Sequence, residues 1–253
     1  MGDRLVLCYH AVSERWPSPL AVTPERLEET LTFLGRRGYR AGTFSETVIR
    51  SGGDRRLAAT FDDAFRSVYV HAFPVLRNLR MTATVFVPTA LVGTGQPMSW
   101  AGVAQWLDGP YAAELTGMSW DELGELADAG WEIGSHTRRH ARLTELDDDV
   151  LADELRGSRE ECERHLGRPC NSLAYPYGAV DERVVRAARE AGYAAAAAPP
   201  NRLPGDLAMR WPRVGVYPDD DLRRLRLKVS PVVRRLSSSR ARAPLWRLKR
   251  LLD

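Results

Sequence analysis

The sequence predicts an α/β fold in which roughly seven parallel strands close into a barrel. Short apolar and β-branched runs alternate with longer amphipathic stretches, the pattern of repeated strand–helix units around a parallel sheet. The chain has 253 residues, of which 44% are hydrophobic and 27% charged, so its apolar content suffices for a core and argues against a disordered or fibrous protein. An open, doubly wound sheet is the alternative arrangement of the same elements.

Strands and helices alternate clearly in the first half of the chain. Pro24 stands at the first helical position behind Thr23, a residue type that caps helices, so a helix is expected from there to about residue 37. The other elements expected here are strands over 5–9, 56–61 and 82–87 and a helix over about 67–79.

The second half begins with a long insertion, residues 93–117, through which Gly, Pro, Trp and Tyr are scattered. Beyond it, Ser119 is expected to cap a helix that runs to residue 129. The remaining expected elements are strands over 131–134, 173–175 and 193–198 and helices over 147–166 and 181–191.

Positive charge is concentrated at the C-terminal end. Residues 222–253 contain eleven Lys and Arg against one acidic residue, whereas the whole chain has a net charge of +3. We therefore divide the chain into a barrel, residues 1–221, and a basic amphipathic tail, residues 222–253. The tail is expected either to lie on an anionic membrane surface or to form a helix that closes the barrel. Because the body is acidic and no recognition motif is present, nucleic acid is not an expected partner.

Features that reflect location favour the cytoplasm. The three cysteines, Cys8, Cys162 and Cys170, are odd in number and widely spaced, which argues against a disulfide framework. No apolar run approaches the roughly 18–20 residues that span a bilayer, and the first residues resemble a strand more than a secretory signal. A cytoplasmic protein is expected, peripheral on the inner membrane surface if the tail binds lipid.

Polar residues follow four separate expected strands. Because the carboxyl ends of parallel strands meet at one mouth of a barrel, these residues are expected to lie together. They are His10, the pair Asp62–Asp63, His136 and the pair Pro176–Tyr177.

Two of these motifs carry ligands of the kind that bind metals. His136 and His140 are four residues apart and would share one face of a helical turn, and Asp62–Asp63 supplies adjacent carboxylates. Taken singly, the histidines also fit a solvated helix and the aspartates a turn with a helix cap. Together they fit a site of two histidines and one carboxylate with open positions, a known catalytic metal geometry.

Three motifs, TFDDAF, SHTRRHARL and YPYG, resemble in this order the first three motifs of the polysaccharide deacetylases, carbohydrate esterase family 4 with the NodB-homology fold. The resemblance covers roughly residues 5–216. It implies a distorted (β/α)7-type barrel, one divalent metal ion, commonly zinc, and hydrolysis of N-acetyl groups on amino sugars.

The resemblance also implies roles for single residues. Asp63, His136 and His140 would hold the metal, and Asp62 would be the general base that takes a proton from water. The backbone N–H of Tyr177 would bind the oxyanion, and Pro176 before it would fix the chain at the substrate site.

The sequence departs from the family at two positions. No histidine follows His165, so the usual late general acid is missing, but Cys8-Tyr9-His10 resembles the YH motif of the branch that includes poly-N-acetylglucosamine deacetylases. That branch implies His10 as the general acid; a buried structural histidine is the alternative. Arg213 resembles the arginine that ends a later strand in this branch and would orient Asp62 or contact substrate, unless it simply pairs on a strand surface.

We therefore expect a metal-dependent hydrolase that removes N-acetyl groups from an amino sugar, in a glycan or in a lipid-linked or nucleotide-linked precursor. Two alternatives stay open: a non-catalytic glycan- or membrane-binding module on a degenerate barrel, and a deformylase or other amide hydrolase with the same metal site. Aromatic residues around the insertion are expected to stack on sugar rings or to pack in the core; they are Trp100, Trp106, Tyr111 and Trp120.

Overall fold

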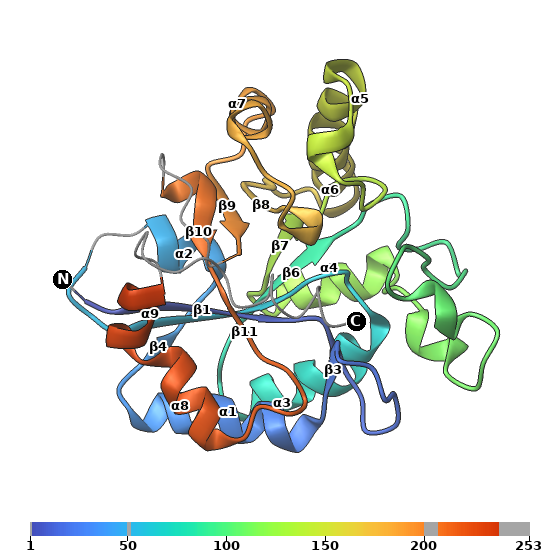
Figure 1. Ribbon diagram of the computed structural model, residues 1–253. Coiled ribbons are helices and arrows are strands. Elements are labelled where there is room, and N and C mark those ends of the chain that lie inside the picture. Colours follow the sequence, from blue (N-terminus) through green and yellow to red (C-terminus); the bar gives the residue numbers. More distant parts are fainter. Residues whose placement is uncertain (1, 50–51, 200–206, 238–253) are drawn as a thin grey trace, which may run out of the picture.

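The computed structural model of the protein describes residues 2–49, 52–199 and 207–237. Its main feature is a nine-stranded parallel sheet that nearly closes into a barrel (Figure 1). The strand order is β10-β9-β8-β7-β6-β5-β1-β11, and β4 pairs with β5 beside this path. The strands are β1 Arg4–Tyr9, β4 Arg40–Ala41, β5 Arg56–Phe61, β6 Thr84–Val87, β7 Glu132–Ser135, β8 Ser172–Ala174, β9 Ala195–Ala198, β10 Trp211–Pro212 and β11 Val214–Gly215. The expected distorted (β/α) barrel in one domain is confirmed.

A single residue links the two edges of the sheet. The strands at the two ends of the order, β10 and β11, follow each other in the chain with only Arg213 between them. β10 pairs with β9 on one side, and β11 pairs with β1 on the other. The backbone itself therefore joins the two edges of the sheet, and the N–H of Arg213 donates to the carbonyl of Ala198 at 3.1 Å.

Helices surround the sheet, and five of them begin at residues whose side chains cap them. Thr23 caps α1 and Ser119 caps α4, as the sequence predicts; at Ser119 the structure adds a capping box with Glu122. Aspartates cap α5, α7 and α8 in the same way. The helices are α1 Pro24–Arg36, α2 Phe44–Ile49, α3 Phe73–Asn78, α4 Trp120–Asp128, α5 Asp148–Ala152, α6 Ser158–Leu166, α7 Glu182–Glu190, α8 Leu222–Val229 and α9 Pro231–Ser237.

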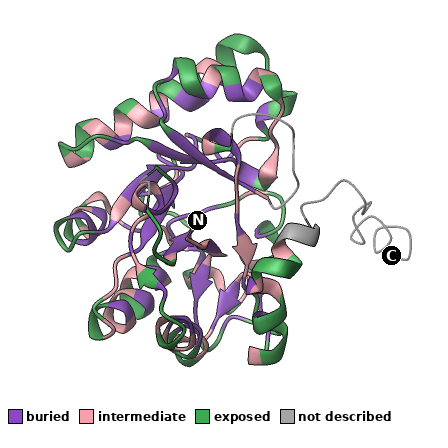
Figure 2. Ribbon diagram, turned by 90° about the vertical axis from the view of Figure 1, so that its left-hand side faces the viewer, coloured by how far each residue is buried: buried purple, intermediate pink, exposed green. Residues whose placement is uncertain are grey.

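Buried residues line the strands and the inner faces of the helices, while the outer helix faces are exposed (Figure 2). The four residues of β9 are all alanine, and all four are buried. The rigid strands thus hold the residues at their carboxyl ends in fixed positions.

The first part of the basic tail packs against the barrel. Leu225 and Val229 of α8 are buried in the main core, and the guanidinium of Arg226 lies over the Phe33 ring of α1 at 5.2 Å. Arg234 of α9 pairs with Asp3 at 2.5 Å. The expected amphipathic helix is therefore present over α8; the part of the tail at 238–253 lies outside the described residues. Among the helices of the described residues, none is long and apolar enough to cross a membrane.

Some elements differ from the sequence prediction. The helix expected over 67–79 consists of a π-helical turn, Val68–Ala72, followed by α3. The helix expected over 147–166 likewise contains a π-helical turn, Asp153–Gly157, between α5 and α6. The helix α2 and five two-residue strands, including β2 Ala11–Val12 and β3 Ala21–Val22, have no signal in the sequence pattern because they are too short to show a periodicity.

Candidate active site

Residues that follow the strands gather at one mouth of the barrel. His10 comes directly after β1, Asp62 after β5 and His136 after β7, and Tyr177 lies three residues beyond the end of β8. These strands are parallel, so their carboxyl ends share one edge. These residues therefore lie together at one mouth, as the sequence predicts.

Three side chains form what we call the histidine cluster: Asp63, His136 and His140. Oδ1 of Asp63 lies 3.4 Å from Nε2 of His136 and 3.2 Å from Nε2 of His140. All three residues are buried, and their potential ligand atoms lie within 4.8 Å of one another. The cluster therefore presents two imidazole nitrogens and a carboxylate oxygen to one point.

This cluster fits a divalent cation. Oδ1 of Asp63 is buried and, among the described residues, has no partner in hydrogen-bond geometry despite its short separations from the two histidines. Nδ1 of His136 donates to the carbonyl of Ala174 at 2.8 Å, which leaves Nε2 with its lone pair facing the cluster. Burial alone would raise the pKa of Asp63, but the two imidazoles hold it well below its usual range, so the carboxylate is ionised.

The His136–His140 segment is not helical, which corrects the sequence prediction of a helical turn. Thr137 has φ of 67° and His140 has φ of 57°, both in the left-handed region that non-glycine residues rarely adopt. Asp63 and Tyr177 share this feature, with φ of 71° and 56°. Strained backbone of this kind is held by surrounding contacts and gathers at functional sites.

A buried carboxylate holds the segment in place. Glu154, in the π-helical turn between α5 and α6, accepts hydrogen bonds at 2.9 Å from the backbone N–H groups of Arg138 and Arg139. The Arg139 side chain adds an ion pair to the same residue at 3.2 Å. Nothing in the sequence singles out Glu154, because it lies within a run of acidic residues on one amphipathic helix and belongs to no motif.

Asp62 pairs with Arg213, whereas the adjacent Asp63 faces the two histidines. Nη1 and Nη2 of Arg213 donate to its two carboxylate oxygens at 2.6 and 2.7 Å, and Nη1 also donates to Thr60 at 3.0 Å. Both residues of the pair are buried. Burial by itself would raise the pKa of Asp62, but the guanidinium lowers it to about 2, so Asp62 is ionised at neutral pH.

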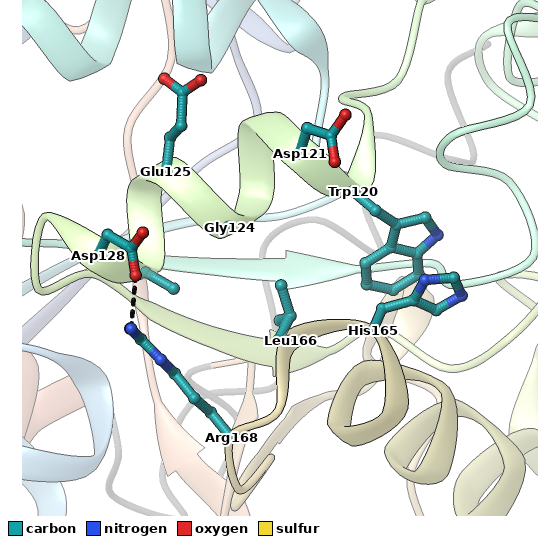
Figure 3. A pocket seen from close by; sticks show the side chains of 9 residues that line it. Trp120, Asp121, Gly124, Glu125, Asp128, His165, Leu166 and Arg168 are labelled. Atoms are coloured by element: carbon teal, nitrogen blue, oxygen red, sulfur yellow. Dashed lines mark hydrogen bonds and ion pairs between the residues drawn. The ribbon is translucent and has the colours of Figure 1, made fainter.

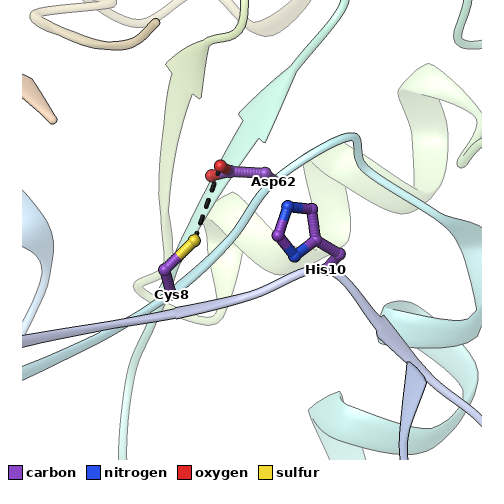
Figure 4. Close-up of side chains that lie close together, drawn as sticks. All are labelled: Cys8, His10 and Asp62. Atoms are coloured by element: carbon purple, nitrogen blue, oxygen red, sulfur yellow. Dashed lines mark hydrogen bonds between the residues drawn. The ribbon is translucent and has the colours of Figure 1, made fainter. Parts of the chain in front are cut away.

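A second set of side chains, the cysteine cluster, comprises Cys8, His10 and Asp62 (Figure 4). Sγ of Cys8 lies 3.6 Å from Oδ2 of Asp62, and the ligand atoms of the three residues lie within 4.8 Å of one another. His10, which is half-buried, therefore stands beside the carboxylate that the sequence analysis selects as the base.

Tyr177 lies in a 3₁₀ turn, Pro176–Gly178, at the same mouth. The two hydrogen bonds of the turn are donated by the N–H groups of Gly178 and Ala179, so that of Tyr177 takes no part in them. Its ring contacts His140 at 4.7 Å between centroids, and Arg142 lies over it at 4.3 Å.

One of the four aromatic residues around the insertion contacts the site. The Trp100 ring lies 4.4 Å from that of His140. Trp106 packs on Trp16 and Tyr111 instead. Trp120 stacks on His165 at 4.2 Å in a separate surface pocket, beside the Asp128–Arg168 ion pair (Figure 3).

A parallel barrel whose mouth gathers two histidines and two carboxylates has the side chains of a candidate hydrolytic site. Among protein families, the sequence model of the polysaccharide deacetylase family matches residues 50–196 of this chain. The chain belongs to this family, carbohydrate esterase family 4 with the NodB-homology fold.

Curated relatives agree with this assignment. YxkH of Bacillus subtilis strain 168, whose name places it among the polysaccharide deacetylases, is 25% identical over 193 residues, which are 74% of this chain and 61% of that protein. The chain thus spans less than two thirds of that relative's length. A poly-β-1,6-N-acetyl-D-glucosamine N-deacetylase of Staphylococcus epidermidis is 23% identical over 218 residues, 76% of this chain and 70% of that protein.

Solved structures share the fold. IcaB from Ammonifex degensii is 26% identical, with a TM-score of 0.67 over 87% of this chain and 94% of that one. A deacetylase from Streptococcus pyogenes, solved in complex with acetate, is 20% identical with a TM-score of 0.75, covering 91% of this chain and all of that one. This second likeness supports the barrel fold alone.

Proposed function

We propose that the protein is a metal-dependent deacetylase that hydrolyses N-acetyl groups on an amino-sugar glycan. One observation carries the proposal: in a polysaccharide deacetylase barrel, adjacent carboxylates face two different partners. Asp63 faces His136 and His140, and Asp62 faces Arg213. The first arrangement suits a metal ligand, and the second suits a base that stays ionised.

The histidine cluster would hold the ion, for which zinc suits the ligand set of two imidazoles and one carboxylate. When bound, a divalent cation there would polarise the amide carbonyl and lower the pKa of water. Asp62 would accept the proton of the attacking water, because Arg213 fixes both of its oxygens and keeps it charged.

The remaining steps fall to residues around the mouth. His10 would donate a proton to the leaving amine; it lies in the cysteine cluster beside Asp62, so acid and base are close together. The Tyr177 N–H would stabilise the oxyanion of the tetrahedral intermediate, and Pro176 would fix the chain before it.

An amino-sugar glycan is the substrate class that the relatives suggest, because one of them is named for poly-β-1,6-N-acetyl-D-glucosamine. Trp100 and Tyr177 flank His140 and would offer aromatic surfaces to a sugar ring. The glycan would be either a polymer or a lipid-linked or nucleotide-linked precursor. The cytoplasmic location is likewise a prediction.

We also propose that the tail contacts an anionic membrane surface. Leu227 and Val232 are each 64% exposed on α8 and α9. Arg223 and Arg224 lie on the same segment, and residues 222–237 contain no acidic residue. Exposed apolar side chains among positive charges are typical of helices that lie on anionic lipid.

Acetate release from N-acetylglucosamine oligomers, measured together with the metal content of the purified protein, tests the function. We expect about one metal ion per chain and acetate release that a chelator abolishes. A protein that binds metal and releases formate from N-formyl sugars, but releases no acetate, would support the deformylase. A protein without metal and without hydrolysis would support the binding module instead.

A further inference from the structure

We propose that the cysteine cluster, Cys8, His10 and Asp62, is a second metal site, which takes a thiophilic divalent cation such as Cd²⁺ or excess Zn²⁺ and inhibits the enzyme. Metal binding at this cluster does not depend on the proposed function. Only the inhibition of the enzyme rests on the proposed function. The cluster shares no residue with the histidine cluster.

The backbone brings the three donors together. Cys8 and His10 are two residues apart at the end of β1, and side chains with that spacing lie on the same face of an extended chain. β5 runs parallel beside β1, with Cys8 opposite Thr60, so Asp62 follows on the neighbouring strand. The result is a sulfur, an imidazole and a carboxylate within 4.8 Å of one another (Figure 4).

This mixed donor set selects the kind of ion. Thiolate and imidazole favour zinc, cadmium and similar cations over magnesium or calcium, which prefer oxygen ligands. The separation of 3.6 Å between Sγ of Cys8 and Oδ2 of Asp62 is close to that of two ligands on one tetrahedral ion. The cluster therefore has three of the four ligands of such a site, and water can supply the fourth.

Arg213 decides how tightly the ion binds. Its guanidinium already pairs with both oxygens of Asp62, and its charge repels a cation. Each carboxylate oxygen has a second lone pair that the arginine does not use. As the metal–sulfur bond forms, the thiol proton leaves to solvent, so the charge of the site rises by one instead of two. We therefore expect binding weaker than at the histidine cluster, at metal concentrations above those that fill the first site.

A metal ion bound at the cysteine cluster would block two catalytic groups at once. The ion would take the lone pairs of Asp62 and His10, the residues proposed as base and acid. Excess metal would then inhibit turnover although the first site is filled.

A cadmium titration of the zinc-loaded protein tests the site. Thiolate–cadmium bonds absorb in the ultraviolet, so the signal reports sulfur ligation independently of activity. Cys8→Ala removes the proposed sulfur. Cys162→Ala is the matched control, because Cys162 is also a free cysteine but is fully buried in a hydrophobic core cluster that contains none of the three donors. Far-ultraviolet circular dichroism checks that each variant is folded.

We expect the absorption to saturate at one Cd²⁺ per chain in the wild type and in Cys162→Ala, and to vanish in Cys8→Ala. The Cd²⁺ concentration that halves acetate release should rise at least tenfold in Cys8→Ala. An unchanged band in Cys8→Ala, or no band in the wild type, would overturn the site. A band that depends on Cys8 in a protein without deacetylase activity would keep the site and remove the inhibition, which separates this inference from the proposed function.

Discussion

Arg213 and Asp62, 151 positions apart in the chain, form a buried two-pronged ion pair with separations of 2.6 and 2.7 Å at the seam of the barrel. Arg213 is also the single residue that joins β10 to β11. The same position therefore closes the sheet and holds the proposed base, so barrel geometry and the orientation of Asp62 are coupled.

Replacing this arginine should separate the two roles. Arg213→Lys keeps a positive charge but loses the planar pair of donors, so we expect kcat to fall roughly 100-fold with little change in KM. Arg213→Ala leaves Asp62 buried without its partner and should lower the free energy of unfolding by about 3–5 kcal/mol. Steady-state kinetics and chemical denaturation measure the two effects; equal kcat in Arg213→Lys and wild type would contradict the orienting role.

Glu154 should control metal affinity without contacting the metal. Glu154→Gln removes the carboxylate charge that holds the backbone N–H groups of Arg138 and Arg139, so the His136–His140 segment should loosen. We expect metal affinity to fall about 10–100-fold, measured by competition with a chromophoric chelator. The exposed neighbour Glu160 offers the control, Glu160→Gln, which should behave like wild type; equal loss in both variants would count against the assignment.

Metal should stabilise the folded protein. A ligand that binds only the native state at about 100 times its Kd adds about 2.7 kcal/mol, which corresponds to a rise in Tm of roughly 5–10 °C for a chain of this size. Wild type should show this rise when zinc is added to chelator-treated protein, and His136→Ala should not. A similar rise in both would place the stabilising ion somewhere other than the histidine cluster.

Sedimentation with vesicles tests the membrane contact. We expect binding to vesicles that contain anionic lipid, no binding to phosphatidylcholine alone, and weakening by salt. Leu227→Asp should reduce binding about tenfold. Val70→Asp is the matched control, because Val70 is also an exposed apolar residue but lies far from the tail in the sequence. This variant should bind normally. Binding that Leu227→Asp leaves unchanged would mean that α8 is not the contact surface.

Local signals made much of the fold predictable. Thr23 with Pro24 marks the start of a helix, and the apolar and β-branched residues of Arg56–Phe61 mark a strand, in both cases through residues that are neighbours in sequence. The strands β10 and β11 show no periodicity because each has only two residues, and only the resemblance of Arg213 to an arginine that ends a later strand pointed to β10. Both strands form because β9 and β1 supply their pairing partners.

The site was predictable in composition but not in geometry. Asp63, His136 and His140 carry recognisable motifs, yet the left-handed φ of His140 depends on distant contacts, so a helical turn was the natural and wrong expectation. The contacts of Glu154 are long-range ones that no local pattern encodes, and the pairing of Asp62 with Arg213 was expected only through the resemblance to the family.

The most direct test compares two isosteric changes at adjacent positions, Asp62→Asn and Asp63→Asn. We expect Asp62→Asn to keep one metal ion per chain and to lose acetate release by about 10²–10⁴-fold, because only the base is removed. Asp63→Asn should lose the metal together with the activity, because a ligand is removed. Loss of metal in Asp62→Asn, or full metal content in Asp63→Asn, would contradict the division of labour between the two carboxylates.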